Sequence, residues 1–67
     1  MVTYLLSEST EGWVLYDDAG RTALLPGDLN TVLLDAAKVM RENGDQVHGG
    51  WTAVPGTEVQ TLRFLPR

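Results

Sequence analysis

A chain of 67 residues has room for one compact unit, so we expect a single domain over residues 1–67. The chain has no cysteine, which excludes disulfides and thiolate metal sites, and its net charge of −4 disfavours direct contact with nucleic-acid phosphates. A domain of this size buries only about 60% of the surface of its unfolded chain. We therefore expect a homodimer to supplement the core.

No apolar run in the sequence approaches the 18 or so residues that a membrane span requires. The amino-terminal residues also lack the combination of a basic leader and an apolar stretch that marks a secretory signal. We expect a soluble, cytoplasmic protein that makes no contact with a membrane.

The first part of the chain predicts three strands. Val2–Leu6 is short, apolar and rich in β-favouring residues, and the polar run Ser7–Glu11 after it is typical of a loop. Trp13–Tyr16 and Arg21–Leu25 have the composition of a second and a third strand. The segment Asp17–Gly20 between them supplies turn chemistry, since aspartate side chains bond nearby amides and glycine accepts positive φ.

One amphipathic helix follows. Apolar residues recur every three or four positions from Leu29 to Met40, which indicates a helix with one buried face. Asp28 stands where its carboxylate can accept hydrogen bonds from free amides at the helix start. Asn43 and Gly44 predict the end of the helix, because glycine readily takes the left-handed conformation found at helix ends.

The last part of the chain predicts a second hairpin. Val47–Val54 and Glu58–Leu65 have strand composition, and Pro55-Gly56 between them suits the centre of a type II turn. The fold class is therefore α+β, in the order β-β-β-α-β-β. We expect an antiparallel sheet of four or five strands, with the helix packed across one face.

Each hairpin opens with Gly-Trp, at Gly12-Trp13 and at Gly50-Trp51, and each closes with Leu-Pro. This similarity allows two interpretations. One is an internal duplication, and the other is independent use of residues that any hairpin can contain. The different turn lengths favour the second.

We expect no catalytic residue, no metal site and no cofactor. His48 is the only histidine, and a catalytic role would require it to meet Ser7 or Ser9 and an orienting acid, although these serines belong to a polar connector. The pair Asp17-Asp18 lacks the regularly spaced oxygen ligands of a calcium loop, so turn formation explains it better.

The apolar surface of the strands exceeds what one helix can cover. Trp13 and Leu15 alternate with Val14 and Tyr16, so apolar side chains occur on both sheet faces. An uncovered apolar face usually marks a contact surface. We therefore expect a non-catalytic protein–protein interaction module, homodimeric and also able to bind another protein. Its predicted binding residues are Trp13, Leu15, Trp51 and Phe64.

An alternative function follows from the acids in the first quarter of the chain, Glu8, Glu11, Asp17 and Asp18. If they form one negative surface, the protein could occupy a basic site on a nucleic-acid-binding protein as a small acidic regulator. On either hypothesis the chain itself does not bind nucleic acid.

Overall fold

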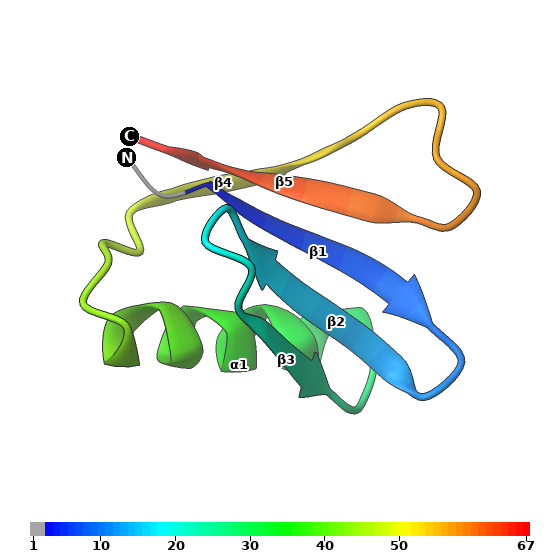
Figure 1. Cartoon of the computed structure of the whole chain (residues 1–67), viewed down its shortest axis with the longest axis horizontal. Coiled ribbons are helices and arrows are strands. Elements are labelled where there is room, and N and C mark those ends of the chain that lie inside the picture. Colours follow the sequence, from blue (N-terminus) through cyan, green and yellow to red (C-terminus); the bar gives the residue numbers. More distant parts are fainter. Residues whose placement is uncertain (1–2) are drawn as a thin grey trace.

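A computed structural model describes residues 3–67 and contains one five-stranded antiparallel sheet and one helix (Figure 1). The elements in chain order are β1 (Tyr4–Ser9), β2 (Gly12–Asp17), β3 (Thr22–Leu25), α1 (Leu29–Glu42), β4 (Gly49–Ala53) and β5 (Thr61–Pro66). The α+β class and the order β-β-β-α-β-β are confirmed. Within the described residues, α1 is too short and too polar to cross a membrane.

The strands lie in the order β3-β2-β1-β5-β4, so β1 is the centre of the sheet and β3 and β4 are its edges. The chain makes two antiparallel ribbons, β2 with β3 and β4 with β5, and β1 joins them by pairing with β2 on one side and β5 on the other. Figure 1 shows α1 beside the half of the sheet that contains β2 and β3, the strands with which it makes contacts.

The helix has well-formed ends. The Asp28 carboxylate accepts a hydrogen bond of 3.0 Å from the backbone N–H of Thr31, and this bond is the main reason that the pKa of Asp28 lies below its usual value. At the other end Gly44 has φ +83° and its N–H bonds the carbonyl of Arg41, while Asp45 N–H bonds that of Met40. This pair of bonds is the Schellman motif, so both predicted helix signals are confirmed.

The core lies between α1 and one face of the sheet. Alternate residues of the strands enter it because successive side chains of a strand point to opposite faces. The helix contributes three buried residues at four-residue spacing. Among residues 3–67, the buried apolar residues are Tyr4, Leu6, Trp13, Leu15, Leu25, Val32, Ala36, Met40, Leu62 and Phe64.

The strand boundaries differ from the predicted ones most at the end of β1 and at the start of β5, and β4 also begins two residues later than predicted, at Gly49. β1 continues through Ser9 instead of stopping at Leu6, since Ser7 and Glu8 lie opposite Val14 and Trp13 of β2. Pairing with two neighbours outweighs the weak strand preference of these polar residues. β5 begins at Thr61 instead of Glu58, because the segment 54–60 forms a wider connection. Val2, placed in the first strand by the sequence, lies outside the described residues.

The two Gly-Trp hairpins occupy unequal positions. The strand that carries Trp13 is internal, whereas the strand that carries Trp51 is an edge. Trp13 lies opposite Leu25 and Trp51 opposite Phe64. In a simple internal repeat, β2 and β4 would occupy equivalent places in the sheet. Instead β2 pairs with both β1 and β3, whereas β4 pairs only with β5.

Two adjacent glycines in β4 differ in how much space surrounds them for a side chain. Gly49 has φ +156°, and a Cβ there would lie 2.2 Å from the carbonyl oxygen of Leu65. A Cβ on Gly50 would meet no atom within 4 Å. Only Gly49 therefore needs to be glycine for the β4–β5 ribbon to close.

We expect Gly49→Ala to lower the free energy of unfolding by about 2 kcal/mol, because backbone or ring atoms must move to admit the methyl group. Gly50→Ala is the matched control and should change it by less than about 0.5 kcal/mol. Urea titration followed by circular dichroism measures both values. Equal values for the two variants would show that the close approach at Gly49 is unimportant.

Candidate interaction surfaces

Three of the four predicted binding residues lie in the core. Trp13, Leu15 and Phe64 are 5%, 2% and 5% exposed on the side of the sheet that α1 covers. They therefore offer no free surface in this structure. Trp51 is half-buried, and its ring packs edge-on against Phe64 with 5.3 Å between ring centroids and 61° between planes.

The opposite sheet face carries a second set of apolar side chains. We call it the outer face, and its apolar residues are Leu5, Val14, Tyr16, Leu24 and Leu65. Leu24 and Leu65 are each 51% exposed, and Tyr16 is 39% exposed. Strand register aligns Leu24 with Val14, and Tyr16 with Leu5, so these residues form neighbouring rows across β3, β2 and β1. No helix packs on this side within residues 3–67.

The centre of the outer face is polar but uncharged. Ser7 and Thr61 lie opposite each other on β1 and β5, and their hydroxyls share a hydrogen bond of 3.2 Å. Arg63, next to Leu5 in the register, is the only charged residue at the outward positions of the five strands. Low charge density beside exposed apolar side chains is the usual composition at the centre of a protein–protein interface.

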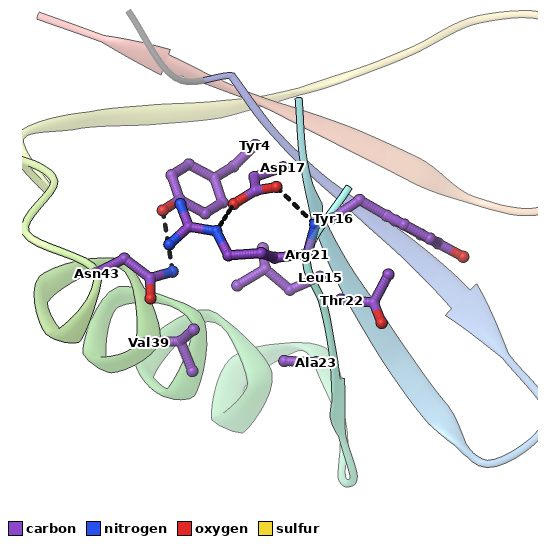
Figure 2. A pocket seen from close by; sticks show the side chains of 9 residues that line it. All are labelled: Tyr4, Leu15, Tyr16, Asp17, Arg21, Thr22, Ala23, Val39 and Asn43. Carbon is purple, nitrogen blue, oxygen red and sulfur yellow. Dashed lines mark hydrogen bonds and ion pairs between the residues drawn. The ribbon is translucent and has the colours of Figure 1, made fainter. Parts of the chain in front are cut away.

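A pocket of about 270 Å³ opens between the β2–β3 ribbon and the end of α1 (Figure 2). Leu15, Ala23 and Val39 give it apolar walls, and Tyr4, Asp17, Arg21 and Asn43 place polar atoms around it. Figure 2 shows the ring of Tyr16 pointing away from these polar groups. The volume is below the roughly 300–1,000 Å³ that small-molecule sites usually have.

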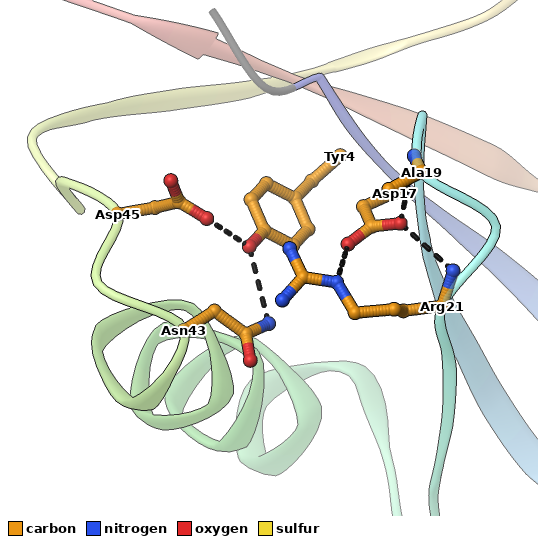
Figure 3. A network of polar contacts seen from close by, with 6 residues as sticks. All are labelled: Tyr4, Asp17, Ala19, Arg21, Asn43 and Asp45. Carbon is orange, nitrogen blue, oxygen red and sulfur yellow. Dashed lines mark hydrogen bonds and ion pairs between the residues drawn. The ribbon is translucent and has the colours of Figure 1, made fainter.

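The polar groups at this pocket join the helix end to the sheet (Figure 3). The buried Tyr4 hydroxyl donates a hydrogen bond to the Asp45 carboxylate and accepts one of 3.2 Å from the Asn43 side-chain amide. Burial raises the pKa of Tyr4, and the bond to Asp45 raises it further. Because β1 and the helix C-terminus are far apart in sequence, this contact fixes a tertiary arrangement.

The Asp17 side chain organises the β2–β3 turn. Its carboxylate accepts hydrogen bonds from the backbone N–H groups of Ala19 and Arg21, at 3.0 and 2.8 Å, and also forms an ion pair with the Arg21 guanidinium. Desolvation acts to raise the pKa of Asp17, but the bonds from Arg21 and Ala19 outweigh it and hold the pKa below its usual value. The predicted turn role of this residue is confirmed, with Gly20 at φ +87°.

The acids of the first quarter of the chain do not form one surface. Glu8 is near the end of β1 and Glu11 is in the turn that follows it, while Asp17 and Asp18 lie at the β2–β3 turn, at the other end of β2. Six residues of extended strand separate the two ends by about 20 Å. Asp17 is also neutralised by Arg21.

The residues considered for catalysis also have structural partners. Ser7 bonds Thr61, and the Ser9 hydroxyl donates to the carbonyl of Gly12. His48 is exposed next to β4, where its carbonyl accepts a hydrogen bond from Arg67. Within residues 3–67, no group of three or more histidine, aspartate or glutamate side chains converges in a way that could hold a metal ion.

Comparison of the chain with family models, with curated proteins and with solved structures found no match. The sequence predicts apolar residues on both sheet faces, and three of the residues named for binding, Trp13, Leu15 and Phe64, are buried on the face that α1 covers. The signal that could have separated the two faces is the alternation of polar residues in β1 and β5, where Ser7, Thr61 and Arg63 share the face of Leu5.

We expect Tyr4→Phe to lower the free energy of unfolding by about 1 kcal/mol at neutral pH, through loss of the two hydroxyl hydrogen bonds. The pH dependence should change as well. Because the folded-state pKa of Tyr4 is raised, its contribution is fully present below the pKa of a free tyrosine, about 10, and is lost as the pH rises through the higher folded value.

Thermal unfolding at a series of pH values from 8 to about 11.5 tests this linkage. The fall in stability at the alkaline end should be smaller in Tyr4→Phe than in the original chain. The control Tyr16→Phe removes the phenol on the outer face and should keep the full fall. If the two variants behave alike, the contact of Tyr4 with Asp45 and Asn43 does not control the alkaline transition.

Proposed function

We propose that this chain is a non-catalytic protein–protein interaction module that works as a homodimer and binds a partner protein through the outer face. The observation that carries the proposal is the presence of exposed apolar side chains on the sheet face that α1 leaves uncovered. A cytoplasmic location belongs to the same proposal and is supported by the absence of cysteine.

The outer face replaces the surface that the sequence predicts around Trp13 and Phe64. Leu24 and Leu65 lie on opposite ribbons of the sheet, so a partner that contacts both must cover the face from β3 to β5. Exposed leucines cost solvation free energy in the isolated chain, and burying the exposed part of each in a complex would recover about 1 kcal/mol. The proposed partner is a protein with a complementary apolar surface.

The positive charge of Arg63 favours a partner with an acidic group at the matching position of its surface. The guanidinium is the one charge among the outward strand positions, and an acid on the partner could bond it at the border of the apolar rows. A partner with a basic surface would instead meet repulsion there. The alternative of an acidic regulator for a basic site has no comparable support, because the acids of β1 and β2 are divided between two turns.

A photoreactive benzoylphenylalanine placed at Leu24 or at Leu65 tests the outer face in cells that produce the protein. We expect a discrete crosslinked product from both positions, identified by mass spectrometry. The matched control is the same group at Leu34, which is 76% exposed on α1 and therefore on the other side of the sheet. Crosslinking from Leu34 with equal yield, or no product from the outer face, would contradict the proposal.

Once a partner is identified, charge substitution should weaken its binding. The double variant Leu24→Lys, Leu65→Lys places two unpaired charges in the contact, and we expect the dissociation constant to rise more than about tenfold. Leu34→Lys makes the same chemical change outside the contact and should leave the constant unchanged. Isothermal titration calorimetry measures the dissociation constant for the original chain, the double variant and Leu34→Lys.

A further inference from the structure

The two edges of the sheet differ in how they are protected against pairing with another chain. A free edge presents unbonded backbone N–H and C=O groups, and charged residues, prolines or short length usually prevent its association. β3 has four residues, with Arg21 before it and Pro26 after it. β4 has five residues, Gly49–Ala53, and like β3 it contains no charge and no proline. Its direct neighbours in the chain, His48 and Val54, are neither lysine, arginine nor acid, and the nearest proline is Pro55, one position further away than Pro26 is from β3.

The register of β4 and β5 identifies which backbone groups of β4 are free. Val54 N–H bonds the carbonyl of Thr61, and Arg67 N–H bonds the carbonyl of His48, each at 2.9 Å. In an antiparallel pair the bonded residues alternate along the strand. His48, Gly50, Thr52 and Val54 therefore direct their backbone groups to β5, whereas Gly49, Trp51 and Ala53 direct theirs away from the sheet.

We propose that two copies of the chain associate through their β4 edges, antiparallel and with Trp51 on the twofold axis, to form one continuous ten-stranded sheet. This inference rests on the homodimer of the proposed function and specifies its interface. In this register Trp51 faces Trp51 of the second copy, and Gly49 faces Ala53. Each facing pair exchanges two main-chain hydrogen bonds, so three pairs supply about six.

When two β4 strands pair in this register, the residues that face each other carry no charge, and small residues flank the two central tryptophans. Each copy carries a net charge of −4, so association at a charged surface would meet repulsion, but the residues that face each other here are all uncharged. Gly49 has no side chain and Ala53 has a small one, which leaves the space beside the two central indoles open. The half-buried Trp51 rings would then cover each other on the surface that Phe64 leaves exposed.

The position of the helix leaves this edge accessible. α1 contacts β2 and β3, at the far side of the sheet from β4. Figure 1 shows β4 at the side of the molecule away from α1. A twofold axis perpendicular to the sheet keeps both helices on one side and both outer faces on the other. The dimer would therefore present two outer faces side by side and leave Leu24 and Leu65 of each copy free for the partner.

Analytical ultracentrifugation and amide hydrogen exchange of the intact chain test the interface. We expect a monomer–dimer equilibrium, with the amides of Gly49, Trp51 and Ala53 becoming protected as the concentration rises. The amides of Gly50 and Thr52 bond β5 and should be protected at every concentration. A monomer at all concentrations overturns the inference, and so does a dimer in which the three outward amides exchange as fast as in the monomer.

Ala53→Pro removes one outward donor and leaves the bonds to β5 intact, because proline is tolerated at an edge position whose N–H faces solvent. Two hydrogen bonds are lost per dimer, and we expect the dissociation constant to rise about thirtyfold. Gly50→Ala is the control, since its N–H faces β5 and its Cβ meets no neighbour. Circular dichroism verifies that both variants are folded.

The two proposals fail in different ways. If the crosslinking group at Leu24 or Leu65 joins two copies of the 7.3 kDa chain and Ala53→Pro dimerises as before, the copies meet through their outer faces and the edge inference is wrong. If the outward amides are protected in the dimer but the outer face captures no partner, the edge inference holds and the proposed function fails.

Discussion

One helix covers one face of one sheet, and the rest of this structure follows from that limit. Strand side chains alternate between two faces, so five strands offer two surfaces, and α1 can bury only one of them. The large residues Tyr4, Trp13 and Phe64 all enter the covered side. What remains on the other side is a mixture of aliphatic residues, Tyr16, hydroxyl groups and one arginine, and the proposed function depends on that mixture.

Strand β1, at the centre of the sheet, holds the two ribbons together by pairing with β2 and β5. Neither ribbon could form a core alone, because a two-stranded ribbon is only marginally stable in water. β1 joins them through Leu6, which is fully buried opposite Leu15 on one side and Leu62 on the other. Tyr4, on the same strand, ties the sheet to the end of the helix through Asn43 and Asp45. The same strand therefore organises both the apolar core and its main polar contact.

The two proposed interfaces use different properties of the same sheet. The outer face would bind through side chains, whereas the β4 edge would bind through the backbone, with Trp51 adding apolar area at its centre. Main-chain pairing is directional and fixes the register of the two copies. A dimer made in that way would place two outer faces side by side without covering either of them.

The sequence alone determined the elements whose signals are local. Asp28, the spacing from Leu29 to Met40 and Gly44 define the helix, because caps and periodicity act within a few residues. The turn at Asp17 and Gly20 was predictable for the same reason. The strand extension through Ser9 was not, since it depends on pairing with Trp13 and Gly12.

Only the tertiary structure decided which strands lie inside the sheet and which form its edges. Trp13 and Trp51 both follow a glycine and both begin a hairpin, yet Trp13 is in the core and Trp51 is at an edge. The difference comes from strand order, because β1 lies between the hairpins and pairs with the first strand of one and the second strand of the other. Strand order depends on contacts between residues far apart in the chain, and local sequence patterns do not record those contacts.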